Sequence, residues 1–277
     1  MSLKKPIDNS SKPESTLQNI RNTIDSIDNK IHDLLIERAE RVELVVEEKK
    51  KFNEAKLIVY RPSREHEILT RVIQRHKGAL PLKSLINIWR NLISAYISMQ
   101  GELTVCFSST LDKIVNNHFG ADIRKEKVRT ALEALQKLNE NNVNITILPY
   151  PNKDNHWWVN FKNFENIFVI GSISENYNGV PQALILGKQN IEYAAKNMVL
   201  LTSEIQSKDV KKYSSFLLLG NYNIVAEKII ENDKSKIIFS TTASSIEEIE
   251  DKIKSIENSK FNLEESPKIM GAYAVFK

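Results

Sequence analysis

The stretch IRNTIDSIDNKIHDLLIERAERVELVVEEKK, residues 20–50, decides the fold of the first part of this chain. Its apolar residues are spaced alternately by three and four positions, which places them on one face of an α-helix. No Gly or Pro interrupts this pattern, and Ser15 followed by Gln18 forms a capping-box sequence. The sequence therefore predicts a helix from about Thr16 to Lys51, about 50 Å long. The apolar stripe of this helix consists of Leu17, Ile20, Ile24, Ile27, Ile31, Leu34, Val42 and Val45.

Two shorter helices are expected to follow the long one. The first begins near Pro62, a residue that suits a first helical turn, and the second ends near Gln100. Two short helices cannot cover an apolar stripe of about 50 Å, so we expect a homodimer in which two long helices cover each other. Residues 15–101 are thus predicted to form an all-α domain of three helices. The Lys-, Ser- and Pro-rich residues 1–14 are expected to be disordered.

The pattern changes after Gly101, where short β-type runs begin to alternate with amphipathic helical segments. This alternation is typical of an α/β domain, which we expect over residues 102–277. The predicted strands are LTVCF (103–107), NITILPY (144–150), NIFVIGSI (166–173), ALILG (183–187) and SSFLLLG (214–220).

The composition excludes several classes of protein. The net charge is only +4 and acids are interspersed with lysines, which gives no support to nucleic-acid binding. No apolar run approaches the roughly 18 residues of a membrane span, and the N-terminus lacks the apolar stretch of a signal peptide, so we expect a cytoplasmic protein. Cys106 is the single cysteine and the five histidines are scattered. We therefore expect no disulfide and no metal site.

The most informative feature is the pair of cations on the apolar seam of the long helix. The seam continues from Leu34 through positions that Arg38 and Lys49 occupy, 11 residues and about 16 Å apart on one face. A buried cation needs a partner. The two side chains could reach solvent or pair with acids on neighbouring helices, but two of them on one seam favour an anionic ligand.

Arg21 lies at the edge of the same seam but far along the helix. It is about 25 Å from Arg38 and about 42 Å from Lys49 along the helix axis, which no small metabolite spans. Arg21 is therefore either unrelated to the other two cations or completes a second, symmetry-related site on an antiparallel partner.

Three segments resemble, in order and spacing, the three helices of the all-α AroQ-type (type II) chorismate mutases. They are residues 20–50 as quoted above, YRPSREHEIL (60–69) and IWRNLISAYISMQ (88–100), and the resemblance covers residues 17–100. The layout, with a further domain behind the mutase, is similar to that of the alphaproteobacterial members. The resemblance implies an intertwined homodimer that converts chorismate to prephenate in phenylalanine and tyrosine biosynthesis.

The resemblance also implies roles for the cations. Arg38, and Arg21 from the partner subunit, would bind the substrate carboxylates, while Lys49 and Gln100 would flank the ether oxygen of the breaking bond. The rearrangement is pericyclic and needs no cofactor or nucleophile. An enzyme can accelerate it by holding the compact conformer and by aiming fixed charge at the oxygen that becomes negative.

Four positions of the second and third helices complete the implied site. Glu65 would hold the ring hydroxyl, and we expect it to remain ionised because neighbouring cations lower the pKa of a carboxyl group. Arg64 would shape the carboxylate end of the site. Arg61 and Tyr96 depart from the family pattern, which commonly has an acid and a small hydroxyl residue there, so they affect details of substrate recognition.

The second domain resembles, more distantly, a prephenate dehydratase of the periplasmic-binding-protein-like α/β fold. Where that family has its Thr-Arg-Phe signature this chain reads Ser214, Ser215, Phe216, so the catalytic Arg is missing. We therefore expect a degenerate, regulatory or vestigial dehydratase-like domain. It could sense an aromatic amino acid, in which case Trp157 and Trp158 could line the pocket, although adjacent tryptophans are also typical of packing at a domain edge.

Three alternatives stay open from the sequence. A lyase that cleaves isochorismate uses a similar helical scaffold, although Glu65 and the dehydratase-like domain favour the mutase. A bifunctional chorismate mutase–prephenate dehydratase is the stronger enzymatic alternative. From a different class, the helices could be a dimerisation module of a regulatory small-molecule sensor.

Overall fold

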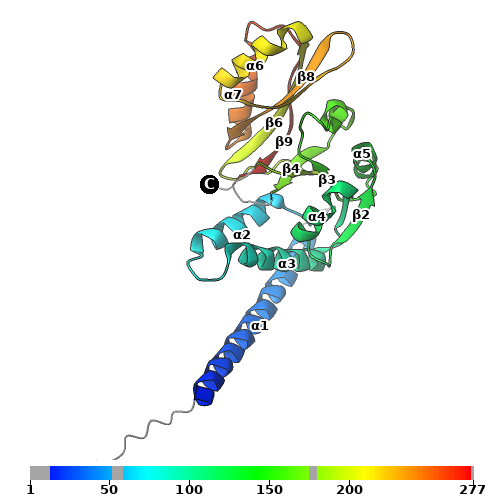
Figure 1. The fold of residues 1–277 in the computed structure, drawn as a ribbon. Helices are drawn as coiled ribbons and strands as arrows, with labels where there is room; N and C mark the ends of the chain where they lie inside the picture. The colour runs from blue at the N-terminus through cyan, green and yellow to red at the C-terminus, as the bar shows by residue number, and fades with distance from the viewer. Residues whose placement is uncertain (1–12, 52–58, 175–179, 276–277) are drawn as a thin grey trace, which may run out of the picture. The chain divides into compact units, whose positions relative to one another are not determined.

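The computed structural model describes residues 13–51, 59–174 and 180–275, and the chain divides into two units, Met1–Lys56 and Leu57–Lys277. Both units are drawn in Figure 1. The division differs from the predicted boundary near residue 101, because the second and third helices share a hydrophobic core with the α/β elements that follow them. The boundary at 101 stays a prediction.

The first unit contains one long helix, α1, over Pro13–Lys51. The predicted helix is confirmed, but it begins at Pro13 rather than near Thr16, so Ser15 lies inside the helix and the expected capping role is wrong. Of the tail predicted to be disordered, residues 1–12 lie outside the described residues. Three lysines, Lys49, Lys50 and Lys51, close the last turn, where positive charge suits the helix dipole.

The apolar stripe of α1 is open to solvent in the single chain. The first six residues of the stripe each keep 49–63% of their surface exposed. An apolar stripe of this length is normally covered by another part of the protein or by a partner. These residues are Leu17, Ile20, Ile24, Ile27, Ile31 and Leu34.

The second unit begins with helices α2 (Pro62–Arg75) and α3 (Leu82–Gln100), so the three helices predicted before residue 101 are all present. Leu69 of α2 and Ile86 of α3 lie in one core with residues such as Phe107 of the first strand. The α/β elements therefore support these two helices.

The next elements form a five-stranded lobe with strand order β2-β1-β3-β5-β4. Strand β1 pairs in parallel with β2 and β3, whereas β5 runs antiparallel to both β3 and β4. Helix α5 begins where Thr130 accepts a hydrogen bond from the Glu133 amide. The elements of the lobe are β1 (Thr104–Ser108), η1 (Ser109–Leu111), α4 (Asp112–His118), β2 (Arg124–Val128), α5 (Ala131–Asn139), β3 (Ile145–Pro149), η2 (Trp157–Asn163), β4 (Phe168–Ile173) and β5 (Ala183–Gly187).

The last elements form a β-α-β-β-α-β unit whose strands lie in the order β9-β6-β8-β7, the ferredoxin-like arrangement. Figure 1 shows α6 and α7 on one face of this sheet, and both helices share a core with the strand residues of that face. The α/β class expected for this part of the chain is confirmed, whereas its division into a lobe and a ferredoxin-like unit was not predicted. The elements are β6 (Asn197–Gln206), η3 (Ser207–Asp209), α6 (Val210–Leu219), β7 (Asn223–Ile229), β8 (Lys234–Ala243), α7 (Ile246–Glu257) and β9 (Leu263–Ala274).

Four of the five predicted strands are present, but SSFLLLG belongs to helix α6, so that strand prediction is wrong. The buried residues of α6 are Val210, Tyr213 and Leu217, which recur at helical spacing, and the prediction overlooked the first two.

Gly271 joins the two sheets into one. It is the residue of β9 that pairs in parallel with Val169 of β4, and its φ is 144°, in the region that L side chains rarely adopt. A Cβ atom built on Gly271 would lie 2.1 Å from the Val169 carbonyl oxygen. The close approach of β9 to β4 therefore requires glycine.

Candidate functional site

The predicted site residues are divided between the two units. Arg21 is exposed on α1, whereas Arg38 and Lys49 are partly buried on the same helix. The other four predicted residues lie on α2 and α3 of the second unit. The three α1 cations therefore belong to one unit and Arg64, Glu65, Tyr96 and Gln100 to the other.

The four residues of the second unit have different surroundings. Arg64 is exposed and pairs with Glu67 at 2.8 Å, while Tyr96 is buried and Gln100 is partly buried. The Gln100 side chain donates a hydrogen bond of 3.1 Å to the Tyr96 carbonyl oxygen of its own helix. Arg61, the first departure from the family pattern, pairs with Glu192 at 2.8 Å.

The side chain of Glu65 lies in a buried polar cluster, whereas that of its neighbour Arg64 is exposed. Its Oε2 accepts a hydrogen bond of 3.3 Å from the Tyr60 hydroxyl, and its Oε1 lies 3.5 Å from His118 Nε2 and 4.0 Å from Arg90 Nε. His118 is the last residue of α4, so the lobe contributes to the surroundings of a mutase-motif residue.

Burial is the largest influence on the pKa values of Glu65 and His118 in this cluster. It raises the pKa of the Glu65 carboxyl group, although Arg90 and the Tyr60 hydrogen bond act in the opposite direction. The expectation that cations hold this pKa low is therefore wrong, because Arg64 is paired at the surface and the cation that does lie near, Arg90, is outweighed by desolvation. Burial also lowers the pKa of His118 well below its usual value, which favours the neutral ring.

Sequence reasoning missed Tyr60, Arg90 and His118. Arg90 carried a readable signal, because it stands between Ile86 and Ile93 on the buried stripe of α3, as Arg38 stands on the apolar but exposed stripe of α1. His118 gave no comparable signal, since only the fold of the lobe brings it to α2.

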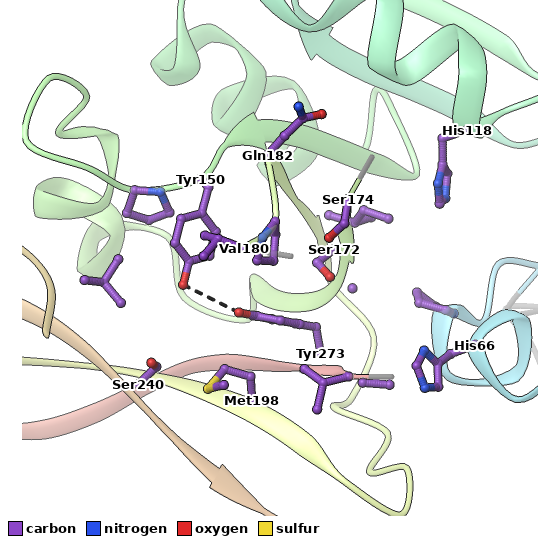
Figure 2. A pocket seen from close by; sticks show the side chains of 18 of the residues that line it. His66, His118, Tyr150, Ser172, Ser174, Val180, Gln182, Met198, Ser240 and Tyr273 are labelled. Carbon is purple, nitrogen blue, oxygen red and sulfur yellow. Dashed lines mark hydrogen bonds between the residues drawn. The ribbon is translucent and has the colours of Figure 1, made fainter. Parts of the chain in front are cut away.

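A cavity of about 900 Å³ opens beside this cluster, between α2, the lobe and the ferredoxin-like unit. Figure 2 shows Tyr150 and Tyr273 pointing toward each other, with their hydroxyl oxygens 3.5 Å apart. Burial raises the pKa of both tyrosines, so both remain protonated at neutral pH. The cavity also presents Ser172 and Gln182 from the lobe and Ser240 from β8.

The tryptophans and Phe216 of the degenerate signature are packing residues. Trp158 is fully buried and Trp157 partly buried in the core beneath the lobe, and their indole nitrogens donate to backbone carbonyl oxygens at 3.2 Å and 2.8 Å. Neither belongs to the described lining of the cavity, so the suggestion that they line a pocket is not supported. Phe216 of the Ser214-Ser215-Phe216 triplet packs against Tyr213 in the core under α6.

Within residues 13–51, 59–174 and 180–275 no group of three or more His, Cys, Asp or Glu side chains could hold a metal ion. In the same ranges no helix has the length and apolar character that crossing a membrane requires.

Comparison with known proteins finds a family model that is similar to the helical segment. Residues 20–101 match the family model of chorismate mutase type II. The bifunctional chorismate mutase/prephenate dehydratase of Aquifex aeolicus is 35% identical over 95 residues, which cover 33% of this chain and 25% of that protein. The enzyme of the same name from Stutzerimonas stutzeri is 27% identical over 144 residues, 49% of this chain and 39% of that protein. The match thus spans less than half the length of either relative.

A solved structure, prephenate dehydratase from Streptococcus mutans, is similar to 63% of this chain and to 98% of its own, with 14% identity and a TM-score of 0.45.

Proposed function

We propose, from the premise that residues 20–101 are a segment of the type II chorismate mutase family, that this chain rearranges chorismate to prephenate. The observation that carries the proposal is the position of Arg38 and Lys49. Both stand on the apolar seam of α1, where a core residue belongs, inside the segment that matches the family. A substrate with two carboxylates explains why several cations are kept on an apolar face.

The catalytic step needs charge at one oxygen atom. In the proposed site Lys49 and Gln100 donate to the ether oxygen of the bond that breaks, and so stabilise the negative charge that develops there. Gln100 would have to release the Tyr96 carbonyl oxygen, its partner in the single chain. Arg38, and Arg21 of the second copy, hold the carboxylates so that the two ends of the substrate approach each other.

The remaining residues select the substrate. Arg64 contributes charge at the carboxylate end, and Tyr96 occupies the helix face where small hydroxyl residues are usual. Glu65 would accept a hydrogen bond from the ring hydroxyl of the substrate. This bond would replace the one that Glu65 accepts from the Tyr60 hydroxyl in the single chain. The raised pKa of Glu65 implies that this acceptor role weakens as pH falls, because a protonated carboxyl loses acceptor capacity.

The homodimer is part of the proposal, and the exposed stripe of α1 supports it. Ile27→Asp should place a charge in the interface between two copies and weaken the dimer by about 100-fold or more. Sedimentation measures the change, and Ser26→Asp, an exposed neighbour off the stripe, is the matched control. Equal dimerisation of both variants would contradict the role of the stripe.

Shared sites give the dimer a second test. Arg21→Ala and Arg38→Ala should each be inactive, yet a mixture of the two proteins should regain activity because some mixed dimers carry one intact site. No recovery after confirmed subunit exchange would argue against sharing.

A second candidate function is the bifunctional mutase–dehydratase, because the two relatives described above carry that name. The missing Arg of the signature, and the position of Ser214–Phe216 on a packed helix, favour the single activity. A regulatory role for the C-terminal part, with an aromatic amino acid as effector, stays a prediction.

One assay separates these candidates. Purified protein should consume chorismate, which is followed by its absorbance, and the product should become phenylpyruvate only after acid treatment. Phenylpyruvate formed without acid would establish the bifunctional enzyme, and unchanged chorismate would leave the helices as a dimerisation module.

A further inference from the structure

Helix α2 begins without a capping side chain of its own. Its N-cap residue is Arg61, whose side chain makes no capping hydrogen bond, and Pro62 follows it at the start of the helix. Ser, Thr, Asp and Asn are preferred at this position because their side-chain oxygens accept hydrogen bonds from the first backbone amides of the helix. A cation at the same position opposes the helix dipole. The start of α2 is therefore stabilised by negative charge that comes from elsewhere in the chain.

Glu192 supplies that charge, although it lies far from α2 in the sequence. It belongs to the connecting loop, residues 188–196, which leads from β5 of the lobe to β6 of the ferredoxin-like unit. One of its carboxylate oxygens accepts a hydrogen bond of 2.8 Å from Arg61 Nε, and the other accepts one from the Ser63 hydroxyl. An exposed ion pair alone contributes little, but this carboxylate also binds a residue of the first turn and lies where negative charge suits the helix dipole.

The connecting loop is fixed to the ferredoxin-like unit. Ile191 and Tyr193, on either side of Glu192, pack against the core of that unit. The fully buried Asn197 side chain accepts from the Ala194 amide at 3.0 Å and donates to the Ala194 carbonyl oxygen at 2.9 Å. The position of Glu192 therefore depends on the ferredoxin-like unit.

The first turn of α2 carries a residue of the proposed mutase site. The Glu65 amide donates to the Arg61 carbonyl oxygen at 3.1 Å, so Glu65 is placed by the residue that Glu192 binds. Gln189 of the same loop donates at 3.0 Å to the carbonyl oxygen of Tyr60, whose hydroxyl in turn donates to the Glu65 carboxylate at 3.3 Å. The connecting loop thus contacts the backbone on which the position of Glu65 depends at two points.

We propose that Glu192 is a positioning residue, which holds the first turn of α2 and with it Glu65 in the geometry that the mutase site uses. Its effect on turnover rests on the proposed function, whereas its contact with α2 does not. Because Ile191 and Tyr193 belong to the ferredoxin-like core, a displacement of that core reaches Glu65 through the same loop.

The kinetic test replaces the carboxylate. Glu192→Ala should raise the KM for chorismate by about 3- to 10-fold, the fold-change that corresponds to the loss of one helix cap. The kcat should change by less than about 2-fold, because Glu65 holds the ring hydroxyl about equally before and during the rearrangement. Glu231→Ala, at an exposed glutamate between β7 and β8, is the matched control and should keep the wild-type KM. An unchanged KM in Glu192→Ala, or an equal rise in both variants, would overturn the proposal.

Hydrogen exchange followed by mass spectrometry tests the contact with α2 without substrate. In Glu192→Ala the amides of residues 61–69 should exchange at least about 3-fold faster than in wild type, because the first turn opens more often. Adding Arg61→Asp to Glu192→Ala should restore the wild-type rate, because aspartate at the N-cap accepts from the amides of its own helix. Glu231→Ala should leave the exchange unchanged.

The two measurements distinguish the positioning role from the mutase activity. Exchange that Glu192→Ala leaves unchanged, or that Arg61→Asp does not restore, would overturn the proposal whether or not the protein consumes chorismate. If the exchange results were as expected but wild-type protein left chorismate unchanged, the proposed function alone would be wrong.

Discussion

Lys49→Ala should lower kcat/KM for chorismate by about 100- to 1000-fold, the usual effect of removing one group that stabilises developing charge on oxygen. Lys49 is the proposed cation at the ether oxygen, and alanine leaves that oxygen without a charged donor. Alanine is also the best helix former, so α1 should persist. The decrease should fall on kcat and kcat/KM together, because the interaction is made chiefly in the transition state. Initial rates of chorismate loss measure both constants.

Lys50→Ala is the matched control for this prediction. Lys50 is exposed and follows Lys49 in the last turn of α1, so its removal changes the same net charge and the same helix terminus. Its rate should stay within a few fold of wild type. If both variants were equally slow, Lys49 would act through the helix or the dimer, and if Lys49→Ala kept wild-type rates the proposed role would be wrong.

Gly271→Ala should lower the free energy of unfolding by about 3–5 kcal/mol, a large loss for one methyl group. Two causes combine at this position. The φ of 144° is strained for any L side chain, and the new Cβ would lie 2.1 Å from the Val169 oxygen and 2.4 Å from its amide nitrogen. Because those atoms are backbone, relief requires β9 to move away from β4, which breaks the pairing that joins the two sheets.

Urea unfolding followed by circular dichroism measures this loss, and Gly78→Ala is its control. A Cβ atom on Gly78 would meet only a His76 ring atom at 3.6 Å, an ordinary contact, so this variant should unfold within about 0.5 kcal/mol of wild type. A Gly271→Ala protein as stable as Gly78→Ala would mean that β9 and β4 can separate without cost.

The sequence predicted part of the site by one principle, which is that a cation on an apolar seam needs a partner. That principle selected Arg38 and Lys49, and applied to α3 it would also have selected Arg90. It could not select Tyr60, which is uncharged, or His118, which reaches Glu65 only because the lobe packs against α2. The shift of the Glu65 pKa was predicted in the wrong direction because desolvation depends on what covers a residue.

By itself, the sequence determined the long helix of residues 20–50, its apolar stripe, the two helices that follow and four of the strands. Helix and strand periods are properties of neighbouring residues, and the seam of α1 is readable because 3.6 residues make each turn. Only the tertiary structure decided the joining of two sheets at Gly271 and the ferredoxin-like order of the last four strands. These depend on pairings between residues such as Val169 and Gly271, far apart in the chain, which leave no local pattern.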